Sequence, residues 1–518
     1  MLYLAFIYHM HQPYYKNLLT DQADLPWVRL HGTKDYLDMV SMLKDFPLIR
    51  QTINVVPSLF EQVEDYTNGL VKDKFLELSY KPAQELNGQD KGFILNNFFM
   101  INRDKVIATH PRYYELYLNK KANRLFNTQD YLDLQVWFNL AWIDPCFRQD
   151  IPELRQVAEK ARFFTEEDKR IVLEKQIDIL EAILPAYKDS MAQGQIEVVL
   201  SPYYHPILPL LCNTRIAKEA NPKSTVPGVN FSFPEDARLQ IDSAVKFYKD
   251  KFGRAPIGMW PSEMAVSEHI LPFIIQSGIK WILADEAILF KSLKKKKRDT
   301  RALYQPYSLD RKDGSLNIVF RDRNLSDLIG FTYANWKAAD AVEDFMKHLE
   351  NTAEAFKGKD VLVTVAMDGE NAWEYFANDG HDFLELLYRR LSEAKFLKTT
   401  TVNEYLNSHS TVKKIERLAA GSWIYGEFSK WINNPYKNKA WECLALARQE
   451  MERCKSEGKA LTDMAIKQMQ ILEGSDWFWW AGEDYPGYFD RLFRMHLANL
   501  YSLLDKEIPE YLSRPIVP

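Results

Sequence analysis

The sequence predicts an α/β fold, a distorted (β/α)7 barrel with a helical insertion and a C-terminal all-α domain. Short apolar segments rich in β-branched residues recur along the chain and helical patterns follow them, which is typical of a parallel sheet covered by helices. Polar and ionisable residues stand directly after several of these segments, as at the C-terminal rim of a barrel. The expected strands are 2–8, 52–56, 196–200, 257–260, 281–284, 316–320 and 361–365.

Long helical stretches interrupt and follow these strands. Residues of about 60–190 read as a helical insertion, because 167–188 carries apolar residues at helical spacing. A further helix is expected over 234–253, where Pro234 and two acids occupy the first turn and Gly253 ends the pattern. Strand signals fade after about residue 385. We therefore expect a catalytic barrel over 1–384, including the insertion, and a helical domain over 385–518.

Composition excludes several classes of protein. The chain has 518 residues, with 66 basic and 71 acidic side chains and a net charge of −5, which argues against binding of nucleic acid through phosphates. Four cysteines lie far apart without C-x-x-C spacing, so we expect a reducing, cytoplasmic location. The N-terminus lacks a basic n-region and no apolar run is long enough to span a membrane, so neither a signal peptide nor a membrane partner is expected.

The stretch 360-DVLVTVAMDGENAWEYF-376 is the strongest candidate for a functional site. A buried apolar strand stops and is followed at once by Asp368 and Glu370. Other expected strand ends supply further candidates, and these are His9, His11, Gln12, His205, Glu263, Asp285, Arg321 and Arg323. Because the carboxyl ends of parallel strands meet at one rim, these side chains are expected to converge.

Two carboxylates on one rim are what glycoside hydrolysis needs, one beside the anomeric carbon and one to protonate the leaving oxygen. Glu263 and Asp368 are the candidates. The structural alternative is that one of them is a buried ion-pair partner of Arg321 or Arg323.

A metal-dependent hydrolase is a competing interpretation. The His9-x-His11 pattern at the end of a first barrel strand can bind zinc, with Asp285 or Asp368 completing the site. No H-E-x-x-H pattern occurs, and the third histidine in a suitable place is His205. A histidine that binds a sugar hydroxyl or a carboxylate explains the pattern equally well.

Several motifs together resemble a known family. They are His11-Gln12-Pro13, 201-SPYYHPILPLL-211, 258-GMWPSEMAVSE-268, 367-MDGENAWEYF-376, 421-GSWIYGEFSKWINNP-435 and the later 473-EGSDWFWWAGED-484. In this order they resemble the family-57 glycoside hydrolases, particularly the α-amylase and amylopullulanase-like members.

The resemblance implies a retaining enzyme on a (β/α)7 barrel that cleaves α-1,4 linkages, with α-1,6 linkages as a further option, in starch- or glycogen-like α-glucans. It implies Glu263 as the nucleophile and Asp368 as the general acid/base, the latter with a raised pKa. It implies neither cofactor nor metal. The residues it places against substrate are His11, Gln12, His205, Trp260, Glu370, Trp423 and Trp431.

The fifth motif departs from the family pattern at Tyr425, Glu427, Asn433 and Asn434. This leaves the acceptor side of the site open, and with it the choice between hydrolysis and transfer by a 4-α-glucanotransferase or branching enzyme. A glycan-binding protein without activity is the third class. The sequence leaves the oligomeric state open.

Overall fold

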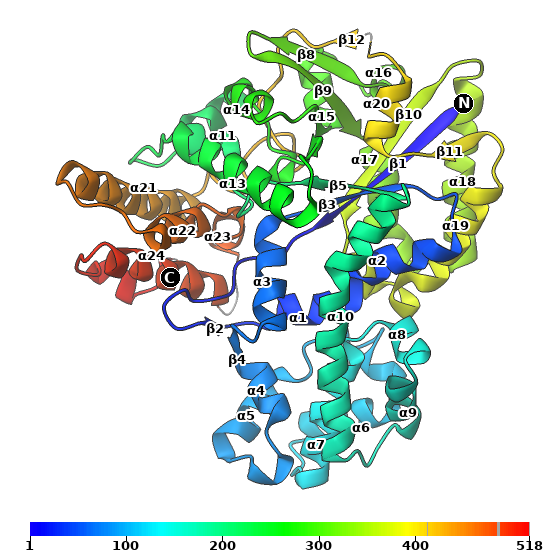
Figure 1. Ribbon diagram of the computed structural model, residues 1–518, viewed down its shortest axis with the longest axis vertical. Helices are drawn as coiled ribbons and strands as arrows, with labels where there is room; N and C mark the ends of the chain where they lie inside the picture. Colours follow the sequence, from blue (N-terminus) through cyan, green and yellow to red (C-terminus); the bar gives the residue numbers. More distant parts are fainter. Residues whose placement is uncertain (412, 484–486, 517–518) are drawn as a thin grey trace.

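The computed structural model of the chain describes residues 1–411, 413–483 and 487–516. Its centre is a set of parallel strands in the order β10-β1-β3-β5-β6-β7-β9 (Figure 1). The two end strands approach each other, because the backbone N–H of Asp322 after β9 donates to the carbonyl oxygen of Thr364 in β10 at 2.8 Å. The strands are β1 (Leu2–Met10), β3 (Gln51–Val55), β5 (Ile196–Leu200), β6 (Gly258–Met259), β7 (Trp281–Asp285), β9 (Gly314–Arg321) and β10 (Val361–Asp368).

This arrangement confirms the predicted (β/α)7 barrel, and each of the seven expected strands overlaps one of these. The strand β6 is shorter than expected. A Cβ atom on Gly258 would lie 2.3 Å from the indole of Trp281, so this position accepts no side chain. Pro261, which has no backbone N–H, follows soon after and cannot extend the ladder.

Apolar side chains fill the inside of the barrel. Ile7, Leu283 and Val319, from three different strands, belong to one buried cluster there. Val402 and Tyr405 of the helix α20 (Val402–Ser408) belong to the same cluster. Because Tyr405 also contacts Tyr3, at the beginning of β1, α20 closes the N-terminal end of the barrel. The opposite, C-terminal end is left for the polar residues.

Further short strands extend the sheet or join loops. The hairpin partner β8 (Tyr307–Arg311) lies antiparallel to β9, and β12 (Lys413–Lys414) pairs with β8. The strand β11 (Leu397–Thr399) pairs with β1. The strands β2 (Gln22–Ala23) and β4 (Lys72–Asp73) form a separate small ladder.

Helices surround the barrel and connect its strands. The helix α13 begins at Pro234 and is closed by Gly253 in the left-handed conformation, as the sequence indicates. The barrel helices are α1 (Trp27–His31), α2 (Asp38–Ser41), α3 (Pro57–Thr67), α11 (Leu208–Cys212), α12 (Ala217–Ala220), α13 (Pro234–Phe252), α14 (Leu271–Gln276), α15 (Glu286–Ser292), α16 (Thr300–Leu303), α17 (Arg323–Asp327), α18 (Ala338–Ala355) and α19 (His381–Glu393).

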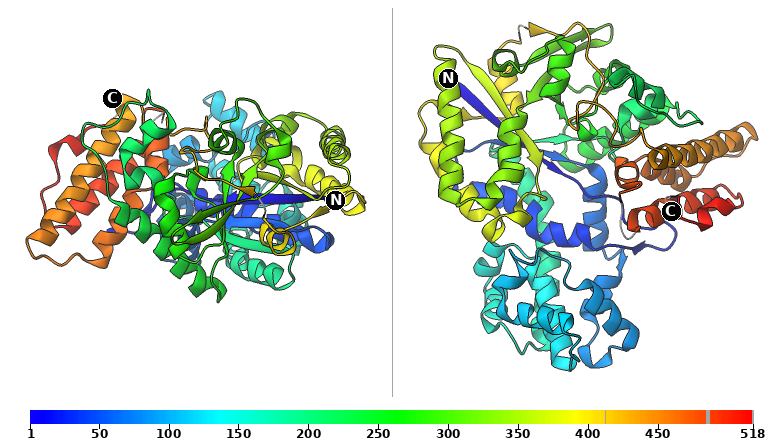
Figure 2. Two further views of the ribbon diagram at one scale, coloured as in Figure 1. Left: turned by 90° about the horizontal axis from the view of Figure 1, so that it is seen from above. Right: turned by 180° about the vertical axis from the view of Figure 1, so that it is seen from behind.

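The segment between β3 and β5 forms a helical lobe at the bottom of Figure 1. Its helices are α4 (Lys74–Tyr80), α5 (Gly88–Asn97), α6 (Pro111–Lys121), α7 (Thr128–Ala141), α8 (Pro145–Asp150) and α9 (Pro152–Lys160). The long helix α10 (Glu166–Ala192) runs from this lobe back to the sheet (Figures 1 and 2). Its beginning is fixed by a capping box in which Thr165 and Asp168 bond each other's backbone N–H groups.

A second group of helices lies beside the barrel, coloured orange to red in Figure 1. It consists of α21 (Pro435–Ser456), α22 (Asp463–Leu472), α23 (Ser475–Trp480) and α24 (Tyr488–Leu503). The expected domain boundary at 384/385 stays a prediction, and Asp484, the last residue of the late motif, lies outside the described residues. In the described part of the chain, no helix has the length and apolar character that a membrane crossing requires.

Candidate active site

The two predicted acids stand at the C-terminal end of the barrel. Asp368 is the last residue of β10 and lies opposite His9 of β1 in the parallel register. Glu263 lies on the turn that follows β6, with φ 58° and ψ 23°. This left-handed backbone conformation is rare for a residue with a side chain. Such a conformation is found where surrounding structure holds a residue in place, often at functional sites.

The carboxylate of Glu263 is held by Trp423 of the fifth motif. The indole Nε1 donates a hydrogen bond to Oε2 at 2.6 Å. Burial raises the pKa of Glu263 to about 8; the hydrogen bond from Trp423 opposes this rise, and the charge of Asp368 adds to it. The two acids therefore lie close enough to affect each other's ionisation.

Asp368 has a different environment. Asn371 donates from its side-chain Nδ2 to Oδ2 at 3.1 Å. Burial raises the pKa of Asp368, whereas the hydrogen bond from Asn371 and the charges of His11 and Arg321 oppose the rise. The raised pKa agrees with the direction expected of an acid/base residue.

The described residues do not form an ion pair between either acid and Arg321 or Arg323. Arg321 pairs with Asp285 and Asp327, and Arg323 pairs with Asp285. Neither Glu263 nor Asp368 has an ion-pair partner among the residues that the structure describes. Within the described chain, the carboxylates of both acids are therefore left without a structural ion pair.

Burial raises the pKa of Glu263 to about 8, so this acid holds its proton at neutral pH. In coupled carboxyl groups the observed titration belongs to the pair rather than to either member. The hydrogen bond from Trp423 stabilises the ionised form of Glu263. The charges of His11 and Arg321 reduce the rise in the pKa of Asp368. The two acids therefore have different environments, although burial raises the pKa of both.

Two histidines and an aspartate complete one side of the site. The rings of His11 and His205 are stacked with centroids 4.0 Å apart. His11 Nε2 lies 3.1 Å from both carboxylate oxygens of Asp476, and His205 Nδ1 lies 2.9 Å from the hydroxyl of Ser475. The buried His11 Nδ1 and His205 Nε2 have no hydrogen-bond partner in the described chain. These nitrogens are therefore buried hydrogen-bonding groups that the described chain leaves without a partner.

The structure does not bring together the zinc ligands that the sequence suggested, His9 and His11 with Asp285 or Asp368. His9 Nδ1 is bonded to the side-chain oxygen of Asn54, and Asp285 is engaged by Arg321 and Arg323. Potential ligand atoms of His11, His205 and Asp476 instead lie within 4.8 Å of one another. Their spacing would allow these three residues to hold a metal ion, but His11 and Asp476 already bond each other.

A large cavity of about 1030 Å³ opens at Asp368. Asp368 and Trp423 line it, together with Phe331, Tyr375 and Tyr425. The last three rings are unusually exposed, at 75%, 60% and 77%. Exposed aromatic faces beside a carboxylate suit the apolar faces of sugar rings.

The other predicted substrate residues lie deeper. Trp260 is buried inside the barrel and its ring stacks on His9, so it forms the floor beneath the site. Gln12 is buried and accepts a hydrogen bond from Tyr15. Burial and the charge of Asp368 raise the pKa of the buried Glu370 well above its usual range. These three residues lie beneath the surface rather than in the open cavity.

Trp431 lies apart from the open cavity. It is fully buried, its ring lies 5.7 Å from that of Trp479, and its carbonyl accepts from the indole of Trp441. An indole without an exposed face cannot stack on a sugar, so its burial favours a structural role.

The divergent fifth motif divides into structural and exposed positions. Glu427 accepts from Asn221 at 2.5 Å, Asn433 accepts from the backbone of Thr225 at 2.6 Å, and Asn434 caps α21. Tyr425 instead projects towards the cavity. Of the four divergent positions, Tyr425 is therefore the one placed to meet a ligand.

Asp476 and Asn371 are site residues that the sequence reasoning did not single out. Asp476 lies in the late aromatic motif, and the backbone N–H of its neighbour Ser475 donates to the carbonyl oxygen of His205 at 3.0 Å. Asn371 follows Asp368 by three positions. The motifs contained both residues, but their partners depend on the fold.

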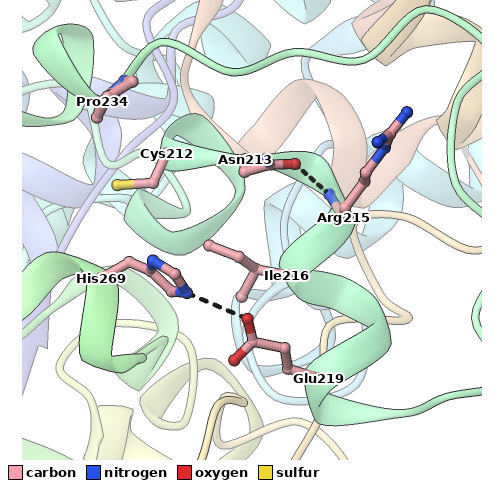
Figure 3. Close-up of a pocket in the computed structure, with 7 residues that line it drawn as sticks. All are labelled: Cys212, Asn213, Arg215, Ile216, Glu219, Pro234 and His269. Atoms are coloured by element: carbon pink, nitrogen blue, oxygen red, sulfur yellow. Dashed lines mark hydrogen bonds and ion pairs between the residues drawn. The ribbon is translucent and has the colours of Figure 1, made fainter.

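A smaller pocket of about 270 Å³ lies away from these residues, beside α11 and the beginning of α13 (Figure 3). His269 Nε2 and Glu219 Oε1 form an ion pair of 3.1 Å across it. None of the predicted site residues lines it. Of the two acids, Asp368 lines the larger cavity, and Glu263 is connected to it through Trp423, which also lines that cavity.

The fold and the acid pair define a class: a (β/α)7-barrel protein with the two rim carboxyl groups that glycoside hydrolysis uses. The chain belongs to glycosyl hydrolase family 57, whose sequence model matches residues 5–417. The match ends before the fifth motif. The prediction that the chain is of the glycoside hydrolase class is thus confirmed at the level of the family.

The individual relatives share low sequence identity with the chain. The chain is 28% identical over 254 residues to alpha-amylase 1 of Dictyoglomus thermophilum, a match that covers 48% of this chain and 32% of that protein. The chain thus aligns with about a third of the curated relative's length. The fold resembles the GH57-type branching enzyme of Pyrococcus horikoshii, with a TM-score of 0.62, 18% identity and coverage of 97% and 89%. It also resembles a GH57 branching enzyme of Thermococcus kodakaraensis in complex with glucose, with a TM-score of 0.60, 17% identity and coverage of 99% and 93%.

Proposed function

We propose that the chain is a retaining glycosidase that acts on α-glucans through a covalent glycosyl-enzyme. Glu263 attacks the anomeric carbon, and Asp368 protonates the departing oxygen and then activates the incoming water. His11 and His205 hold sugar hydroxyls through their unpartnered nitrogens. The substrate class is drawn from family membership and from the similarity to an α-amylase and to glucan branching enzymes.

The observation that carries this proposal is that Glu263, on the turn after β6, and Asp368, at the end of β10, stand at the same end of the barrel. Neither acid has an ion-pair partner among the described residues, because Arg321 and Arg323 pair with Asp285 and Asp327. Burial raises the pKa of both acids, that of Glu263 to about 8, so the site retains the proton that the first chemical step transfers to the leaving oxygen. The hydrogen bond from Trp423 supports the ionised nucleophile once a substrate draws the proton to Asp368. One acid in each state is what double displacement needs.

Azide rescue tests the two roles separately. With an activated aryl α-glucoside, Glu263→Gly should lose turnover by about 10³-fold or more. Azide should restore it and give the β-glucosyl azide, because azide enters from the face that the nucleophile vacates. Asp368→Ala should instead give the α-glucosyl azide, because azide then resolves the glycosyl-enzyme.

Glu268→Gln is the matched control. Glu268 lies in the same motif as Glu263, but its carboxylate is bonded to Arg311 at 2.6 Å. This variant should turn over without azide and form no azide product. If both acid variants gave the same anomer, or neither gave an azide adduct, the assignment of a nucleophile and an acid/base would be wrong.

Transfer to a second sugar is the related candidate, and the size of the cavity favours it. About 1030 Å³ with three exposed rings offers room for an acceptor sugar as well as a donor. A 4-α-glucanotransferase or branching enzyme would use the same two acids. Incubation with maltoheptaose separates the outcomes, since hydrolysis gives mostly shorter products and transfer gives longer ones.

A further inference from the structure

A second cluster of reactive side chains lies where the helical insertion meets the segment that follows Asp368. Cys146 Sγ lies 3.3 Å from His381 Nδ1, and His381 Nε2 lies 2.7 Å from Asp144 Oδ2. Cys146 is at the beginning of α8 and His381 is at the beginning of α19. A thiol, an imidazole and a carboxylate in this order form the hydrogen-bonded chain by which proteins activate a nucleophile.

Asp144 fixes the geometry of this cluster from both sides. Its Oδ1 accepts from the backbone N–H groups of Cys146 at 2.8 Å and Phe147 at 3.3 Å, while its Oδ2 faces His381. One buried carboxylate thus bonds both the backbone of Cys146 and the ring of His381, and it fixes their relative positions. Asp38 adds a second carboxylate at 3.5 Å from His381 Nε2.

The environment favours a charged imidazole. Burial alone would lower the pKa of His381, but hydrogen bonds to Asp144 and Cys146 and the charges of Asp38 and Asp144 raise it to about 12. An imidazolium donates from both nitrogens, so the sulfur of Cys146 is the acceptor of the Nδ1–H group. Acceptance of a charged hydrogen bond favours the thiolate over the thiol.

Cys146 is the most accessible of the four cysteines. It is partly exposed, whereas Cys212, Cys443 and Cys454 are buried. A cavity of about 240 Å³ lies nearby, lined by the neighbouring Pro145 and Arg148 but not by Cys146 itself. Arg148 has no carboxylate within ion-pairing distance among the described residues, and it adds positive charge beside the sulfur.

We propose that Cys146 is an activated thiolate that reacts with small electrophiles and peroxides, independently of the glucan site. Asp144 orients His381, and His381 stabilises the thiolate by a charged hydrogen bond. In reaction with hydrogen peroxide, the sulfur attacks one oxygen and the O–O bond breaks. The sulfur is oxidised to a sulfenic acid, and the leaving hydroxide takes a proton from the His381 imidazolium and departs as water.

Limited alkylation of the folded protein tests the reactivity. Under substoichiometric iodoacetamide at pH 6, peptide mass spectrometry should show Cys146 modified about 10-fold or more faster than the other cysteines. Cys212, Cys443 and Cys454 serve as internal controls. Equal labelling of all four cysteines, or slower labelling of Cys146, would overturn the proposal.

The role of the histidine is tested by His381→Gln, which should lower the alkylation rate of Cys146 about 10-fold or more. His269→Gln is the matched control, because His269 also pairs with a carboxylate but lies in the pocket of Figure 3. An unchanged rate in His381→Gln would contradict the assignment. Circular dichroism establishes that the variant is folded.

The wild-type protein provides a test that needs no variant. After brief peroxide treatment, dimedone should label Cys146 and not the three buried cysteines. Labelling elsewhere, with Cys146 unmodified, would overturn the proposal.

Discussion

Trp423 holds Glu263 through both its side chain and its backbone. The indole donates to Oε2 at 2.6 Å, and the backbone N–H of Trp423 donates to the carbonyl oxygen of Glu263 at 3.2 Å. The neighbouring bridge between Val266 and Gly421 fixes the two motifs to each other. Gly421 has φ 151°, and a Cβ atom there would lie 2.2 Å from the carbonyl oxygen of Gly426. The fifth motif therefore positions the proposed nucleophile.

Trp423→Phe should lower kcat/KM by about 10- to 100-fold, because it removes a hydrogen bond to a charged group. That hydrogen bond lowers the pKa of Glu263, so its loss should raise the pKa further above about 8. Because Glu263 loses its proton after Asp368, this pKa governs the alkaline limb of the kcat/KM profile, which should then move to higher pH. A profile measured between pH 4 and pH 9 checks the direction.

Trp431→Phe is the control for this substitution. Trp431 is fully buried and its Nε1 has no hydrogen-bond partner in the described chain. Loss of its N–H should leave the pH profile in place even if packing weakens. A shift of the alkaline limb in both variants would mean that Trp423 acts through stability rather than through Glu263.

The same two tryptophans show how far the sequence alone could lead. Both lie in one motif, eight positions apart, and both were expected to stack on sugars. The structure places Trp423 against Glu263 and buries Trp431 among other indoles. Burial depends on which helices pack over a residue, and local sequence does not contain that information.

Strands and rim acids were predictable for a different reason. A buried parallel strand is a short apolar run, and Asp368 follows such a run directly. The contact of His11 with Asp476 spans 465 positions in the chain, so no local pattern indicates it. The barrel was therefore predictable from periodicity, whereas the partners of its rim residues required the fold.

Glu263→Gln should stabilise the protein at alkaline pH. Burial raises the pKa of Glu263 from 4.5 to about 8, so the folded state holds this proton more tightly than the unfolded state. The wild type therefore loses stability as the pH rises from 4.5 to about 8, and glutamine, which stays neutral, does not. The variant should gain about 2 kcal/mol in the free energy of unfolding at pH 9 and little at pH 4, as measured by urea titration.

Glu385→Gln provides the reference for that titration. Glu385 is an exposed partner of Arg389 on α19, at 2.6 Å. Its substitution should change stability by less than about 0.5 kcal/mol at either pH. If Glu263→Gln were equally stable relative to the wild type at pH 4 and pH 9, the raised pKa of Glu263 would be contradicted.

The exposed rings of the cavity should govern binding of long glucans. Tyr425→Ala and Phe331→Ala each remove a face that is mostly exposed beside Asp368. Loss of one stacked sugar is worth about 0.5–1.5 kcal/mol, so KM for maltoheptaose should rise roughly 2- to 12-fold. Turnover of an aryl glucoside, which does not reach these rings, should stay near the wild-type value.

Trp336→Ala controls for the loss of an exposed ring in general. Trp336 is 46% exposed but does not line the cavity. It should leave KM unchanged for both substrates. If Tyr425→Ala also lowered the ratio of longer to shorter products, Tyr425 would be assigned to the acceptor side of the site.

Removal of metal should leave glucan turnover unchanged, because the proposed mechanism uses two carboxyl groups and neither step draws on a metal ion. Activity before and after dialysis against EDTA, together with elemental analysis of the purified protein, measures this. Added zinc should inhibit, since His11, His205 and Asp476 offer ligand atoms within 4.8 Å and the two histidines are the groups proposed to bind sugar hydroxyls. EDTA should reverse that inhibition. Activity that is lost on chelation and restored by one equivalent of zinc would instead favour a metal-dependent hydrolase built on the same three residues.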